Sequence, residues 1–105
     1  IWATTVRVPV LYGHSETIWV ETRKPASLDE VRKAIEASEN VELTDKVISP
    51  LDGAGTDLVY VSRLRAFDDT RFLMWNVADN IRVGAATNAV RILKKHRALN
   101  ARSFE

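Results

Sequence analysis

Arg7 and His14 are the residues of this sequence whose types and spacing could do chemistry together. Alternation along a predicted strand at 3–11 places its valines on one face and Arg7 on the other. Gly13 ends that run, and His14 follows at a predicted turn. A guanidinium can hold a carboxylate through two parallel hydrogen bonds, and an imidazole can move a proton near neutral pH. The pair therefore indicates a site that binds a carboxylate and catalyses proton transfer.

A structural interpretation of the same residues stands beside the catalytic one. An arginine on a strand face is usually solvated or paired with a carboxylate, and a histidine after a glycine is usually a turn residue. On spacing alone this interpretation is favoured, because such short patterns are common. His96 has a structural explanation too, since positive charge suits the last turns of a helix. Gly84 precedes two alanines, and these small residues would allow another backbone or a ligand to approach closely.

Length and composition are those of one ordinary globular domain. The chain has 105 residues, of which 46% are hydrophobic and 28% are charged. A net charge of +1 gives no electrostatic reason to expect nucleic acid or an anionic membrane as a partner. The apolar runs are too short to span a bilayer, and no signal-peptide pattern opens the sequence. Because Ile1 stands where an initiator methionine is expected, the chain is predicted to be cut from something longer.

The sequence contains no cysteine. A disulfide framework is therefore excluded, which fits a reducing compartment, and we expect a cytoplasmic protein. A thiol nucleophile is excluded within these residues as well. Spacings typical of metal ligands, such as paired histidines in HExxH, are also missing, so no metal is predicted.

The order of predicted elements is β-β-α-β-β-β-α. This order indicates an α+β domain with a mixed or antiparallel sheet and helices on one side. Ser27 and Glu30 have the spacing of a capping box, and Asp79 can cap the last helix. Trp19 shares its face with polar residues, which leaves open whether it packs in the core or meets a partner or ligand. The predicted strands are 3–11, 16–23, 41–44, 58–64 and 72–78, the first two forming a hairpin; the helices are 28–38 and 80–99, and 49–57 is a loop.

Ordered blocks across nearly all of the sequence resemble the bacterial aspartate-semialdehyde dehydrogenases. Residues 7–10 and 13–16 look like the segment that carries the substrate arginine and catalytic histidine of these enzymes. Residues 49–57 are similar to their proline-containing loop, 58–65 to the strand that follows, and 74–90 to the closing strand and helix. The resemblance covers only the last third of these enzymes. It implies the C-terminal catalytic and dimerisation domain of the semialdehyde dehydrogenase and glyceraldehyde-3-phosphate dehydrogenase-like fold, without the Rossmann domain and the cysteine segment.

The resemblance also implies an activity and a role for four residues. The activity is the reversible, NADP-dependent reductive dephosphorylation of aspartyl phosphate to aspartate semialdehyde, on the route to lysine, methionine and threonine. Arg7 would hold the substrate carboxylate, and His14 would be the acid/base. Asn80 matches a family position near the nicotinamide carboxamide, and Gly84 would let the backbone approach the cofactor. The family's sheet pairs across a two-fold axis, which implies a homodimer.

Two hypotheses follow from the sequence. In the first, the chain is part of a dehydrogenase and supplies the substrate arginine, the acid/base histidine and the dimer interface. In the second, it is a non-catalytic dimerisation or binding module that kept the fold. Arg7 and His14 favour the first hypothesis. The missing cysteine leaves the second open, as do Ser62, Leu73 and Val83, which stand where the family commonly has glycine, asparagine and lysine.

Overall fold

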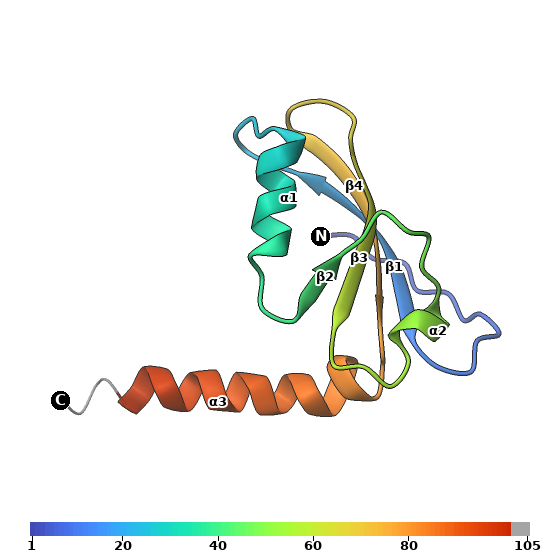
Figure 1. Ribbon diagram of the computed structural model, residues 1–105, viewed down its shortest axis with the longest axis vertical. Helices are drawn as coiled ribbons and strands as arrows, with labels where there is room; N and C mark the ends of the chain where they lie inside the picture. Colours follow the sequence, from blue (N-terminus) through green and yellow to red (C-terminus); the bar gives the residue numbers. More distant parts are fainter. Residues whose placement is uncertain (102–105) are drawn as a thin grey trace.

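A four-stranded sheet organises the chain in the computed structural model, which describes residues 1–101 (Figure 1). The strands lie in the order β1 (His14–Glu21), β4 (Arg71–Ala78), β3 (Val59–Ala66) and β2 (Val41–Leu43). β4 is antiparallel to both of its neighbours, whereas β2 runs parallel to β3. The predicted α+β class with a mixed sheet is confirmed.

The sheet has two faces, because side chains alternate along each strand. The Phe72 face carries Phe72 and Val61, whose side chains are buried. The Trp75 face carries Trp75 and Val77 on β4 and Ser62 on β3, and both Val77 and Ser62 are fully buried. Core residues therefore lie on both faces of the sheet.

Two helices lie on opposite sides of the sheet (Figure 1). α1 (Leu28–Glu36) begins with the predicted capping box, in which Ser27 N donates to Glu30 Oε2 and Glu30 N donates to Ser27 Oγ. α2 (Pro50–Gly53) lies against the Trp75 face, where a Cβ on Gly53 would be only 2.9 Å from Val77 Cγ1. The prediction of helices on one side is therefore wrong, because the segment predicted as a loop forms α2 on the other side.

The last helix leaves the body of the domain. η1 (Arg82–Ala86) is a π-helical turn that continues into α3 (Thr87–Ala101), which confirms the predicted final helix. Figure 1 shows α3 extending away from the sheet and covering neither face. Four apolar side chains of α3 are consequently exposed: Val90, Ile92, Leu93 and Leu99.

The strand predicted at 3–11 is wrong, and so is its hairpin with the second predicted strand. Residues 1–13 contain no strand, and β1 pairs with β4 instead. Pro9 has no N–H to donate to a ladder, and Val10 N donates to Val8 O at 2.9 Å, which closes a tight turn around Pro9. The alternating valines of this segment therefore remain exposed.

The other predicted strands are confirmed with small differences at their ends. β1 begins and ends two residues earlier than predicted and so includes His14, and β3 ends two residues later than predicted. Within residues 1–101, no helix has both the length and the apolar character needed to cross a membrane.

Candidate active site

His14 is the first residue of β1 rather than a turn residue, and it lies opposite Ala78, the last residue of β4. The residue is exposed. Two positions further along β1, Glu16 accepts a hydrogen bond of 3.2 Å from Asn76 Nδ2 across the ladder. The imidazole is thus attached to a backbone that the sheet fixes, and it remains open to a substrate.

Gly13 is held from two sides immediately before His14. Its N–H donates to Asn80 Oδ1 at 2.9 Å. Its φ is +93°, and a Cβ at this position would lie 3.0 Å from the carbonyl oxygen of Pro50. Gly13 is also buried. Both the backbone angle and the available space therefore require glycine here.

Asp79 links the end of β4 to η1 and to the loop after α2. Its Oδ1 accepts from Ile81 N and Arg82 N, each at 2.9 Å, and its Oδ2 accepts from Gly55 N at 2.8 Å. The predicted capping role is confirmed. These hydrogen bonds, first those from Arg82 and Gly55, hold the pKa of the Asp79 carboxyl below its usual range.

Asp57 anchors the start of the last helix, a role that the sequence pattern did not predict. Arg82 binds its two carboxylate oxygens at 3.0 and 2.8 Å, and Thr87 Oγ1 donates to Oδ1 at 2.8 Å. Arg91 Nη2 donates to the carbonyl oxygen of Asp57 at 2.7 Å. The Arg82 and Thr87 hydrogen bonds lower the pKa of the Asp57 carboxyl to about 2. No local signal could have shown this, because the partners lie 25 or more positions away.

Gly84 lies in η1, and this chain alone does not require glycine there. Its N–H donates to the Asp79 carbonyl oxygen at 3.0 Å, one of the wide hydrogen bonds that define the π-turn. A Cβ on Gly84 would have its nearest neighbour at 3.7 Å, an ordinary contact. The position is exposed. Because Gly84 has no side chain, the backbone of this turn is accessible. π-turns within helices are frequent at functional sites.

No hydrogen bond or ion pair in the described part of the chain joins Arg7 to His14. Arg7 lies in the irregular segment 1–13 and is exposed. Within residues 1–101 it forms no hydrogen bond or ion pair that fixes its guanidinium. The role of Arg7 stays a prediction, whereas Asn80 and the backbone before His14 are joined directly.

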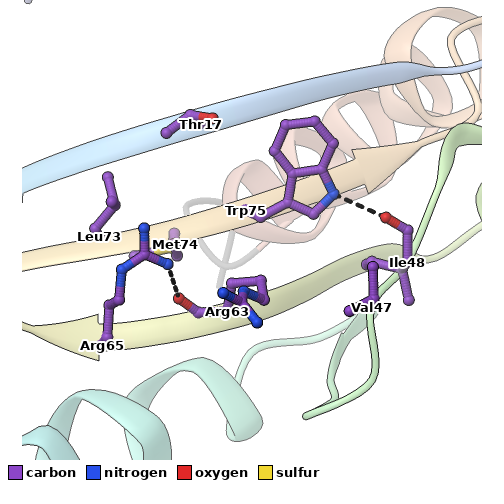
Figure 2. A pocket seen from close by; sticks show the side chains of 8 residues that line it. All are labelled: Thr17, Val47, Ile48, Arg63, Arg65, Leu73, Met74 and Trp75. Atoms are coloured by element: carbon purple, nitrogen blue, oxygen red, sulfur yellow. Dashed lines mark hydrogen bonds between the residues drawn. The ribbon is translucent and has the colours of Figure 1, made fainter.

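A recess lies on the Trp75 face, away from His14. It has a volume of about 510 Å³ and is lined by Leu73 and Trp75 together with Arg63 and Arg65 (Figure 2). Trp75 Nε1 donates to the Ile48 carbonyl oxygen at 3.0 Å. Arg63 has a φ of +56° at a register shift in β3, so a bulge presents this part of the strand to the recess.

Aromatic side chains extend this face toward the far end of β1. The rings of Trp19 and Phe67 lie 4.7 Å apart between centroids, and the two side chains are 49% and 60% exposed. Val47, beside the recess, is exposed as well. Trp19 is therefore a surface residue, and this side of the sheet leaves apolar area open.

A family model described as "Semialdehyde dehydrogenase, dimerisation domain" matches residues 1–83. The chain belongs to this family. The match includes Arg7, His14 and Asn80 and all four strands. It ends one residue before Gly84 and does not include α3.

Proteins named aspartate-semialdehyde dehydrogenase match this chain along most of its length. The aspartate-semialdehyde dehydrogenase of Aquifex aeolicus is 44% identical over an alignment 97 residues long, which covers 86% of this chain and 28% of that protein. Aspartate-semialdehyde dehydrogenase 2 of Vibrio cholerae is 44% identical over an alignment 94 residues long, which covers 85% of this chain and 28% of that protein. The chain therefore spans little more than a quarter of the length of these relatives.

The fold is similar to a solved enzyme of the same family. The crystal structure of aspartate semialdehyde dehydrogenase II complexed with ASA, from Vibrio cholerae, matches with a TM-score of 0.76 and 42% sequence identity. The match covers 84% of this chain and 28% of that chain.

Proposed function

We propose that the chain is the C-terminal part of an NADP-dependent aspartate-semialdehyde dehydrogenase. The reaction is the reversible reductive dephosphorylation of aspartyl phosphate to aspartate semialdehyde, in the biosynthesis of lysine, threonine and methionine, and we propose the cytoplasm as its location. The observation that carries this proposal is the placement of His14, exposed on a backbone that β4 and Asn80 hold, in a chain of this family.

His14 is the acid/base of the proposed reaction. An exposed imidazole can take the proton of a thiol that attacks the acyl carbon, and it can later return a proton to the oxygen on which negative charge develops. The thiol must come from outside these residues, because the chain contains no cysteine. The fixed strand end contributes orientation, which is needed because small displacements of a catalytic group are costly in rate.

Arg7 is the substrate-binding residue of the proposal. Its guanidinium has no partner among residues 1–101 and is available for the carboxylate of aspartate semialdehyde or aspartyl phosphate. A bidentate guanidinium–carboxylate pair would fix the direction of the substrate as well as bind it. The exposed setting of Arg7 supports this role, because a buried ion pair would have occupied the guanidinium already.

Asn80 and Gly84 are the proposed contacts to NADP in this chain. Asn80 uses only its Oδ1 toward Gly13, so its Nδ2 keeps both hydrogens for an acceptor such as a carboxamide oxygen. Gly84 offers accessible backbone in the π-turn that follows. When bound, NADP supplies or accepts the hydride of the reaction. We propose these two positions for the nicotinamide end of the cofactor, and we expect its phosphates to be bound by the Rossmann domain that the resemblance implies.

A second copy of the chain is the proposed protein partner, and the Trp75 face is its docking surface. The family model for a dimerisation domain covers the sheet and not α3, which favours the sheet over the helix. On the sheet, the Trp75 face carries the half-exposed Trp19–Phe67 pair and the recess beside Trp75. Open apolar area of this kind is typical of protein interfaces.

The decisive experiment replaces His14 in the complete enzyme that contains this chain. Reduction of NADP by aspartate semialdehyde and phosphate is followed at steady state. His14→Asn should lower kcat by roughly a hundredfold to ten-thousandfold, the usual scale for loss of a general acid/base, with little change in the KM of the semialdehyde. His96→Asn on α3 is the matched control and should leave kcat unchanged.

Two results would contradict the proposal. One is near-normal turnover by a correctly folded His14→Asn enzyme. The other is dehydrogenase activity in the isolated 105-residue chain, which has no nucleophilic thiol and should be inactive. A complete enzyme with no activity at all on aspartate semialdehyde would favour the alternative of a non-catalytic dimerisation module.

A further inference from the structure

Asn80 continues the β1–β4 ladder beyond its last residue pair. The antiparallel pairs run from Glu21 and Arg71 to His14 and Ala78, where β4 ends. Gly13, the residue just before β1, has no backbone acceptor on β4, because the chain already turns into η1 at Asp79. The side-chain Oδ1 of Asn80 takes the place of that acceptor, at 2.9 Å from Gly13 N.

The elements around this hydrogen bond leave it little freedom. Pro50 contacts Gly13 from the side of α2. Asp79, next to Asn80, is buried and is bound to Gly55 on the loop after α2 as well as to the first turn of η1. Gly13 and Asn80 are therefore fastened to the same two elements, α2 with its loop and the β4–η1 junction. A rotation of the Tyr12–Gly13 peptide, one residue before His14, would have to break the Asn80 hydrogen bond.

We propose that Asn80 is a positioning residue for His14. Its Oδ1 fixes the Tyr12–Gly13 peptide, and through Gly13 the backbone from which the His14 side chain starts, while its Nδ2 remains available to the cofactor. One amide thereby sets the position of the acid/base relative to the nicotinamide end of NADP. This inference rests on the proposed function, because it assigns Asn80 a second task within the same site.

The chemistry of the amide allows the two tasks to be separated by substitution. Asn80→Asp keeps an acceptor oxygen for Gly13 N and loses the donor that would meet the cofactor. Asn80→Ala loses both. A comparison of these two variants therefore isolates the acceptor, because the donor is missing from each.

Steady-state kinetics of the complete enzyme supply the first test. Both variants should raise the KM of NADP. Only Asn80→Ala should also lower the maximal kcat, by roughly tenfold to a hundredfold, because a displaced catalytic group loses about that much rate. Asn80→Asp should stay within about threefold of the unaltered kcat at its own optimum. Each rate is taken at the variant's pH maximum, since a carboxylate near an imidazole moves the optimum. Asn88→Ala on α3 is the control and should change neither parameter.

Amide hydrogen exchange of the 105-residue chain gives a second readout that does not depend on activity. The Gly13 N–H should be protected in the unaltered chain and in Asn80→Asp, and should exchange at least about tenfold faster in Asn80→Ala. If Asn80→Ala does not fold, Asn80→Ser takes its place, because its hydroxyl is too short to reach Gly13.

The outcomes distinguish this inference from the proposed function. Equal kcat values for Asn80→Ala and Asn80→Asp in an otherwise active enzyme would overturn the positioning role alone. Equal exchange of the Gly13 N–H in the unaltered chain and in Asn80→Ala would overturn it as well. If the complete enzyme is inactive but Asn80 still protects the Gly13 N–H, the proposed dehydrogenase function is refuted, whereas the hydrogen bond from Gly13 to Asn80 stands.

Discussion

A Cβ on Gly13 would lie 3.0 Å from the carbonyl oxygen of Pro50 and 3.1 Å from its Cβ. Backbone atoms of α2 thus occupy the space that a side chain at position 13 would need. The relationship joins two segments that are far apart in sequence, and it explains why the residue before His14 is a glycine with a φ of +93°.

Gly13→Ala should therefore destabilise the domain by roughly 1–3 kcal/mol, from the left-handed backbone and the contact with Pro50. Gly84→Ala is the matched control, since a Cβ there meets only ordinary contacts, and it should leave stability unchanged or slightly higher. Urea unfolding of both variants measures the difference. Equal stability of the two variants would contradict this account of Gly13.

In the complete enzyme, Gly84→Ala should still raise the KM of NADP, since the added methyl covers the accessible backbone.

The pH dependence of stability follows from Asp57 and Asp79. The pKa values of both carboxyl groups are lowered in the folded chain, that of Asp57 to about 2. The unfolded chain therefore binds more protons in acid, and the stabilisation by these carboxylates is fully present above their ordinary pKa of about 4. It should be lost as the pH falls from about 4 to 2.

Urea unfolding at a series of pH values tests this window. Asp57→Asn should reduce the loss of stability between pH 4 and 2, because the amide does not titrate there. Asp45→Asn is a suitable control, since the Asp45 carboxylate is highly exposed in its ion pair with Arg32. An unchanged acid slope in Asp57→Asn would be evidence against the anchoring role of Asp57.

Much of the fold could be predicted from sequence because the signals were local. The capping box at Ser27 and Glu30 lies within one turn, and both partners are visible in the sequence. The strand at 72–78 is a short run of apolar residues in which only Asn76 is polar, and β4 has almost the same bounds. The segment at 3–11 alternates in hydrophobicity, but alternation does not provide a partner. Pro9 lies in a tight turn that interrupts this segment, and the outer edge of β1 stays unpaired among the described residues.

The site could be predicted only as residue types. The sequence indicates His14 by its place after Gly13 and by the resemblance, and Asn80 by the resemblance alone. The connection of Asn80 to the backbone before His14, through Gly13, spans 67 positions and depends on how β1 pairs. The close approach of Pro50 to Gly13 could not be predicted, because residues 49–57 were expected to form a loop and instead contain α2 on the Trp75 face. Such long-range contacts leave no periodicity to read.

Ser62 offers a route to a more stable domain. Its side chain is fully buried, and its Oγ has no hydrogen-bond partner among the described residues. An unsatisfied buried hydroxyl costs about 1–3 kcal/mol, so Ser62→Ala should raise the free energy of unfolding by about 1 kcal/mol. Ser62→Gly should gain less, because glycine weakens a strand interior. A lower stability of Ser62→Ala in urea unfolding would show that the hydroxyl has a partner.

The proposed dimer surface makes a prediction about association. Trp19→Glu places a charge in the open apolar area of the Trp75 face, and it should shift the 105-residue chain from dimers or larger species toward monomer. Leu99→Glu on α3 is the comparison variant and should have a smaller effect, because the family match excludes that helix. Sedimentation velocity at several concentrations measures both. A concentration-independent monomer for the unaltered chain would speak against dimerisation through this domain, and a stronger effect of Leu99→Glu would move the interface to α3.

Arg7 can be tested by a substitution that keeps its charge. If Arg7 holds the substrate carboxylate, Arg7→Lys retains the cation but loses the planar pair of donors. The KM of aspartate semialdehyde should then rise by about tenfold or more, and kcat should fall only to the extent that the grip orients the reacting carbon. This pattern differs from that of His14→Asn, which acts chiefly on kcat. Arg23→Lys, which changes another exposed arginine just beyond β1, is the control. Unchanged kinetics in a folded Arg7→Lys enzyme would return Arg7 to the structural interpretation, as a solvated residue in the segment before β1.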